Sequence, residues 1–97
     1  MGVKTTKWDA ADALDTPEQI AYYLEAAFED GDPALIAAAI GDAARARGMT
    51  QIASETGLAR EALYRALSEE GNPEFGTILK VLGALGLRLA PVGRTPS

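Results

Sequence analysis

The chain has 97 residues, of which 47% are hydrophobic and 24% charged, so it has the composition of one small folded domain with little room for a large catalytic cleft. It contains no Cys and no His, which excludes disulfides, thiolate nucleophiles, imidazole bases and the usual zinc sites. The net charge of −5 is atypical of nucleic-acid binders, and together these features predict a non-enzymatic protein without a cofactor or metal ion.

The N-terminal residues 1–15 are predicted to form an arm, in which Trp8 would serve as a packing anchor. Lys4 and Lys7 are not followed by an apolar run of the kind that a signal peptide needs. No stretch of the sequence has the length and apolarity of a transmembrane helix. We therefore expect a cytoplasmic protein with a helical domain over residues 16–92 and a flexible tail over 93–97.

The first helix is predicted from Pro17 to Asp30. Thr16 has the position of an N-cap, and Gln19 that of its capping-box partner. Gly31 should end the helix. Apolar residues recur at helical spacing and predict one buried stripe made of Ile20, Tyr23, Leu24, Ala27 and Phe28.

A second helix is predicted from the Asp32-Pro33 cap signal to Gly48. Arg45 and Arg47 fall in its last turn, where the helix dipole favours cations, so we interpret them as a solvated helix end before considering them as DNA ligands. The apolar stripe of this helix consists of Leu35, Ile36, Ala39, Ile40 and Ala43.

Two short helices follow, and together they have the spacing of a helix-turn-helix over about residues 50–67. Thr50 is predicted to cap the first of them, over 51–56, and Gly57 can adopt the positive φ of the turn. The second short helix is predicted over about 60–67, and Ala53 is small enough to let it cross closely. The core between the two helices would contain Ile52, Leu58, Leu63 and Ala66.

A fifth helix is predicted after the turn or cap at Asn72-Pro73, and Gly83 and Gly86 should weaken and end it. Its apolar stripe would contain Phe75, Ile78, Leu79, Leu82 and Leu85. Residues 87–92 begin with an apolar–polar alternation, which leaves room for one short strand. The predicted fold class is therefore all-α with five helices and this optional strand.

Residues 48–68, Gly-Met-Thr-Gln-Ile-Ala-Ser-Glu-Thr-Gly-Leu-Ala-Arg-Glu-Ala-Leu-Tyr-Arg-Ala-Leu-Ser, followed by Gly71-Asn-Pro-Glu-Phe75 and Leu85-Gly-Leu87, resemble the Xre-like helix-turn-helix antitoxins of the HigA type, which are addiction-module antidote proteins. The resemblance extends to an acidic segment before the first helix and to that helix itself. It implies a lambda-repressor-like domain and an antitoxin that binds a small RelE-like ribonuclease toxin. It also implies a homodimer that represses its own operon.

The resemblance has two local departures. Ala59 lies where such proteins often carry Ser or another N-capping residue, so the fourth helix lacks a cap that contributes about 0.5–2 kcal/mol. Met49 lies where related repressors often have Gln, and we interpret it as core filling.

The outer face of the fourth helix holds the candidate DNA ligands. Arg60 and Arg65 can each bind a guanine edge with two hydrogen bonds or bind phosphate, and the sequence leaves both roles open. Tyr64 can donate to phosphate or contact a thymine methyl, and Glu61 can accept from cytosine N4. Thr50 and Gln51, at the start of the preceding helix, are candidate phosphate ligands.

Structural interpretations compete with these roles. Glu61 and Arg65 are four residues apart and can form an intrahelical ion pair. Tyr64 can be partly core. The helix-turn-helix as a whole can be a structural unit in a protein-interaction module, and a stand-alone Xre-type regulator is a further alternative.

The charge is divided between the two parts of the chain. Residues 1–33 carry −6 and residues 34–97 carry +1, with +2 over residues 45–65. The acidic N-terminal part either increases solubility or meets a basic partner, as a small basic toxin would be. For the expected homodimer, residues 87–92 can add a strand to another chain or pair with residues 4–8.

Overall fold

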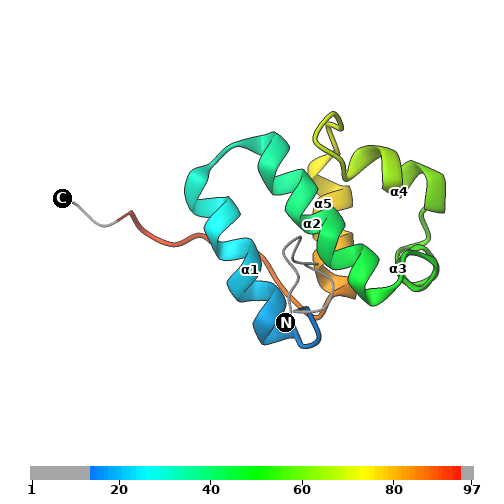
Figure 1. Ribbon diagram of the computed structural model, residues 1–97, viewed down its shortest axis with the longest axis horizontal. Helices are drawn as coiled ribbons and strands as arrows, with labels where there is room; N and C mark the ends of the chain where they lie inside the picture. The colour runs from blue at the N-terminus through cyan, green and yellow to red at the C-terminus, as the bar shows by residue number, and fades with distance from the viewer. Residues whose placement is uncertain (1–13, 95–97) are drawn as a thin grey trace, which may run out of the picture.

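The computed structural model describes residues 14–94. Within this range the chain forms α1 (Pro17–Asp30), α2 (Pro33–Arg47), α3 (Met49–Thr56), α4 (Arg60–Ala66) and α5 (Phe75–Ala84), as Figure 1 shows. The all-α, five-helix prediction is confirmed. Most of the predicted N-terminal arm, with Trp8, and the last three residues of the predicted tail lie outside the described residues.

The starts of α1 and α2 follow the cap signals in the sequence. The Thr16 hydroxyl accepts from the Gln19 backbone N–H at 3.1 Å, while Gln19 Oε1 accepts from the Thr16 N–H at 3.2 Å, which completes the predicted capping box. Asp32 Oδ1 accepts from the Ala34 N–H at 3.1 Å and caps α2. These side chains satisfy backbone donors that the first turn of a helix leaves without partners.

The start of α3 differs from the prediction. The helix begins at Met49 with Gly48 as its N-cap, and no side chain caps it. Thr50 therefore lies inside the first turn of α3 and is exposed, so its prediction as the N-cap was wrong. The reason is that Gly48, at φ 117°, reverses the chain directly after α2 and lets α3 begin two residues early.

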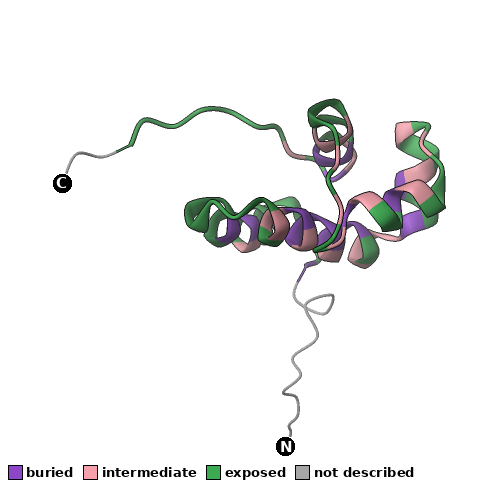
Figure 2. Cartoon of the chain, turned by 90° about the horizontal axis from the view of Figure 1, so that it is seen from above, coloured by how far each residue is buried: buried purple, intermediate pink, exposed green. Residues whose placement is uncertain are grey.

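The helices pack around α2. It contacts α1 on one side and α3 and α5 on the other, while α4 packs against α3. Figure 1 shows α1 and α4 at opposite ends of the helical body. The buried residues, purple in Figure 2, lie on the sides of the helices that face one another. Their apolar side chains form one continuous core.

Each helix contributes to this core. Fully buried side chains include Ile20 of α1, Ile40 of α2, Ile52 of α3 and Leu63 of α4. Ala43 and Ala44 are also fully buried, so α2 is surrounded closely on this face. Because no buried polar or charged side chain is present among the described residues, burial of apolar surface stabilises the interior.

The apolar stripe of α5 is displaced from the predicted one. Phe75 is 66% exposed and Leu79 is 43% exposed, whereas Val81, which the prediction omitted, is fully buried. The inward face consists of Ile78, Val81, Leu82 and Leu85. The predicted stripe and the observed one both have helical spacing, so the sequence pattern does not distinguish them. The buried side of α5 is the one that contacts α2 and α3. On α1 and α2 the predicted Phe28 and Leu35 lie at the exposed edges of their stripes.

Residues 87–92, for which the sequence left room for a strand, form no strand in the described chain. The Leu87 backbone N–H still donates to the Leu82 carbonyl at 2.9 Å, which holds the start of this segment against the end of α5. Beyond Leu87 the chain is exposed and leads away from the helices (Figures 1 and 2).

Gly41 allows α2 to approach the end of α4, and its substitution tests this packing. A Cβ at Gly41 would collide with the backbone carbonyl of Leu67, whereas a Cβ at Gly76 on α5 would meet nothing within 4 Å. The better helix propensity of Ala contributes about 0.5–1 kcal/mol, but overpacking a core costs about 1–3 kcal/mol. We expect Gly41→Ala to lower the free energy of unfolding in denaturant titration, and Gly76→Ala to raise it. Equal gains in both variants would contradict the close approach.

Candidate nucleic-acid interface

α3 and α4 are two short helices joined by a tight turn, an arrangement that the predicted helix-turn-helix requires. Gly57 ends α3 with φ 77°, and its N–H donates to the Ala53 carbonyl at 2.9 Å. Residues 57–59 then reverse the chain, and α4 begins at Arg60. The predicted positive φ at Gly57 is confirmed, and it is a conformation that L-residues other than Gly rarely adopt.

Thr56 holds this turn through contacts that the sequence analysis missed. Its hydroxyl donates to the Ile52 carbonyl at 2.8 Å and accepts from the Leu58 N–H at 3.3 Å. Thr often bonds backwards to a carbonyl one helical turn earlier, so Thr immediately before Gly in a predicted turn was an available signal. The hydroxyl links the last turn of α3 to the backbone that leads into α4.

The two helices share most of the predicted core, but Ala66, its fourth predicted member, is not part of the core cluster. Ile52 is fully buried and Leu63 is 1% exposed, and Leu58 is partly buried against them. These contacts fix the orientation of α4 relative to α3. Ala59, the N-cap of α4, has extended backbone (φ −68°, ψ 139°) and makes no side-chain cap, as the sequence predicted.

The outer face of α4 presents the candidate ligands to solvent. Arg60, Glu61 and Arg65 are exposed, and Tyr64 is 40% exposed. The Arg60 guanidinium carbon lies 5.5 Å from the centroid of the Tyr64 ring, within the range of a cation–π contact. Tyr64 is therefore a surface platform for Arg60 more than a core residue.

Glu61 and Arg65 do not form the ion pair that their spacing allows. The one ion pair within residues 14–94 joins Arg45 and Asp42 on α2. Arg65 is thus exposed on α4 without a carboxylate partner in this part of the chain. With two arginines and one glutamate, this face carries a positive charge, although the whole chain is acidic.

The first turn of α3 lies next to this face in the chain. The first backbone N–H of α3 with a partner inside the helix is that of Ile52, which donates to the carbonyl oxygen of Gly48 at 3.0 Å. The N–H groups before it have no partner within the helix, and such groups favour anions. Thr50 and Gln51 are exposed there, and Gln51 Nε2 donates to Glu55 at 3.0 Å.

Arg45 and Arg47 make contacts within the fold. Arg45 binds Asp42 at 2.5 Å, and Arg47 donates to the carbonyl of Ala84 at the end of α5 at 3.1 Å. Arg47 therefore stabilises the C-terminus of a different helix from its own, by satisfying a carbonyl that lacks an intrahelical partner. The sequence placed both residues at a helix end but gave no sign of the contact with α5.

A polar cluster joins α1 to α2 away from α4. The Tyr23 hydroxyl donates to Asp42 Oδ2 at 2.7 Å, and the other oxygen of Asp42 accepts from Arg45. The pKa of Tyr23 is raised to about 12, mainly by burial and also by the hydrogen bond to Asp42 and the negative charge of this carboxylate, while the charge of Arg45 acts in the opposite direction. The protonated phenol is therefore part of the contact between α1 and α2.

Neither a metal centre nor a membrane span is built from the described residues. No group of three or more acidic side chains in this range is arranged to hold a metal ion. Of the five helices, none combines the length and apolarity needed to cross a membrane. Exposed arginines on α4, and a first turn of α3 without a side-chain cap, are each suited to binding anions.

Comparison with known proteins identifies the family. The family model "Probable addiction module antidote protein" matches residues 4–92. The chain belongs to this family. A curated protein of Haemophilus influenzae, described as an uncharacterized protein, is 47% identical over 81 residues, which cover 84% of each chain. No solved structure gives a significant match. Within this antidote family, the Xre-like HigA type remains a prediction.

The Tyr23 contact predicts a loss of stability at alkaline pH. Because the pKa of Tyr23 in the folded protein is raised above its ordinary value of 10.0, the contribution of this group to stability is complete below about pH 10 and is lost as the pH rises through about 12. We expect Tyr23→Phe to remove this part of the pH dependence in denaturant titrations. Tyr22→Phe is the control, because Tyr22 is 80% exposed, and it should leave the dependence in place. Identical profiles for wild type and Tyr23→Phe would contradict the assignment.

Proposed function

We propose that this antidote-family protein is a sequence-specific DNA-binding repressor of its own operon and the antitoxin of a type II toxin–antitoxin module. The observation that carries the proposal is the exposed, arginine-bearing α4, which is held at a fixed angle over α3 by a shared buried core. It acts by binding and not by catalysis. It works as a cytoplasmic homodimer on a palindromic operator.

The docking follows from the geometry of helix-turn-helix proteins. In these proteins the second helix enters the major groove and the first lies across the phosphate backbone. Here α4 would bring Arg60, Tyr64 and Arg65 to the groove, and the N–H groups at the start of α3 would face phosphate with Thr50 and Gln51. Two-fold pairing would place two copies of α4 about 34 Å apart or at a multiple of this spacing.

The contact with Tyr64 suggests different roles for the two arginines. Stacking on the ring restricts the Arg60 guanidinium and would favour planar recognition of a guanine edge. Arg65 has no such restraint and is suited to either phosphate or base. Glu61, between them on the same face, would accept from cytosine or disfavour other bases.

DNA binding is tested with operator fragments in gel-shift titrations. We expect Arg60→Ala and Arg65→Ala each to weaken binding about 5- to 150-fold, the equivalent of about 1–3 kcal/mol for a lost bidentate contact. Their folding should be unchanged, because both side chains are exposed. Lys80→Ala on α5 removes one exposed charge outside the helix-turn-helix and is the matched control.

Salt dependence completes this test. Binding that neutralises phosphates weakens steeply as salt rises, and each phosphate contact removed reduces the slope by about 1. Unchanged affinity in both arginine variants would refute the assigned face. Absence of binding to the protein's own promoter at low salt would favour a protein-interaction module, the alternative function.

The toxin partner is proposed to bind α1. Glu18, Tyr22, Glu25 and Glu29 recur at helical spacing on its exposed face, and Tyr22 is 80% exposed at the centre of these acids. An aromatic anchor bordered by carboxylates suits a small basic protein such as a RelE-like ribonuclease. This face lies at the other end of the fold from α4 (Figure 1), so it is separate from the proposed DNA surface.

This surface is tested by co-expression with the product of the neighbouring reading frame. We expect Glu25→Lys/Glu29→Lys to slow association with that protein and Tyr22→Ala to speed dissociation, as measured by surface plasmon resonance. Glu69→Lys/Glu70→Lys, which makes the same charge change after α4, should have little effect. If the two double variants associate equally slowly, general charge and not the α1 face is responsible.

A further inference from the structure

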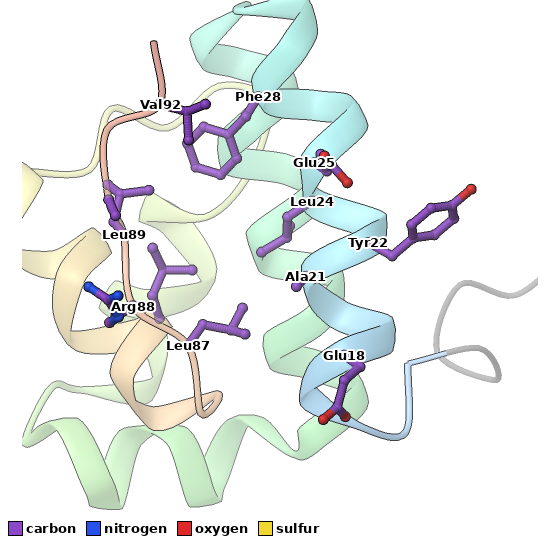
Figure 3. A pocket seen from close by; sticks show the side chains of 12 residues that line it. Glu18, Ala21, Tyr22, Leu24, Glu25, Phe28, Leu87, Arg88, Leu89 and Val92 are labelled. Carbon is purple, nitrogen blue, oxygen red and sulfur yellow. The ribbon is translucent and has the colours of Figure 1, made fainter.

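An apolar groove runs between α1 and the segment that follows α5. It has a volume of about 600 Å³, and its walls are mainly apolar. Figure 3 shows Leu24 and Phe28 directed from α1 toward the segment, which supplies Leu87, Leu89 and Val92 on the opposite side. Val92 is 89% exposed and Phe28 36%, so the groove leaves apolar side chains in water on both of its walls.

The backbone of the same segment lacks partners within the described chain. The last backbone hydrogen bond outside the helices is the one from the Leu87 N–H, and none involves residues 88–94. The segment is extended and exposed, as Figure 2 shows. An extended segment with free N–H and C=O groups is a template for pairing with another strand.

We propose that the occupant of this groove is the same segment of a second copy of the chain. Residues 88–92 of the two copies would pair antiparallel about a two-fold axis, and each would enter the groove between α1 and the segment of the other copy. This proposal rests on the homodimer of the proposed function and adds its interface. The contact is reciprocal, since each copy offers both a segment and a groove.

The position of Pro91 decides which edge of the segment can pair. Pro has no N–H, so residue 91 has to occupy a position that does not exchange hydrogen bonds with the partner. N–H groups alternate between the two edges of a strand, which leaves those of Arg88, Ala90 and Val92 to point to the partner. Among the two-fold registers that this edge allows, we assign the one centred on the middle of residues 88–92, which places Ala90 opposite Ala90 of the second copy and Arg88 opposite Val92.

Charge and location also favour a second copy. Residues 87–94 carry Arg88 and Arg94 and no acid, whereas the α1 side of the groove carries Glu18 and Glu25. The apolar segment with two cations thus matches an apolar groove with an acidic border. The groove borders α1 and not α4 (Figure 1), so pairing here leaves the outer face of α4 free in both copies.

The first test is the mass of the full chain in solution, measured without DNA by analytical ultracentrifugation. We expect wild type to have twice the monomer mass of 10.1 kDa, and Leu89→Asp/Val92→Asp to have the monomer mass at the same concentration. Phe75→Asp introduces a charge at another exposed apolar residue, outside the groove, and should stay dimeric. Circular dichroism verifies that each variant keeps its helices.

The second test is cross-linking through one introduced cysteine. The natural chain has no Cys, so a disulfide between protein cysteines in a single-cysteine variant can only join two copies. Directly opposed residues in a hydrogen-bonded antiparallel pair have Cα atoms about 5.5 Å apart, within the range of a disulfide. We expect Ala90→Cys to cross-link when treated with oxidised glutathione, and Ser54→Cys, exposed on α3, to remain monomeric on a denaturing gel.

The outcomes separate this inference from the proposed function. A dimeric wild type with a monomeric double variant and cross-linking at residue 90 supports the interface. A double variant that remains dimeric, or Ala90→Cys that does not cross-link, overturns the interface while leaving the homodimer in place. A monomeric wild type that binds its operator overturns the homodimer and this interface but not DNA binding.

Discussion

The buried contact between α3 and α4 is the constraint on which the rest of the molecule depends. Ile52 and Leu63 exclude water from the angle between two short helices, neither of which is long enough to be stable alone. α4 also lacks a side-chain cap, so its helical structure relies on this packing. The orientation of the exposed arginines therefore follows from the apolar side chains beneath them.

The fold separates the acidic and basic parts of the chain. The acidic face of α1 and the positively charged face of α4 lie at opposite ends of the helical body, with α2 between them. An acidic average charge is consequently compatible with local attraction to a polyanion, because surface charges separated by more than about 10 Å are largely screened at moderate salt. The same separation keeps the proposed DNA surface on α4 apart from α1, where the proposed toxin face and the groove proposed for a second copy share Glu18, Tyr22 and Glu25.

Local signals made most of the fold predictable. The caps at Thr16 and Asp32 and the turn at Gly57 depend on neighbouring residues, and the structure confirms them. The errors concern tertiary context: the inward side of α5 is chosen by α2 and α3, and the start of α3 by the turn at Gly48. For the candidate site, the exposure of the α4 residues followed from helical spacing. The hydroxyl bonds of Thr56 and the contact of Arg47 with α5 require the folded geometry.

The most direct test of the central claim is an NMR titration of the isotope-labelled full chain with its operator DNA. The account predicts that the amide signals of α4 and of the first turn of α3 shift first and most, because these elements meet the groove and the phosphates. The signals of α1 should remain close to their free positions apart from the general broadening of a larger complex. Shifts concentrated on α1, with α4 unaffected, would contradict the account.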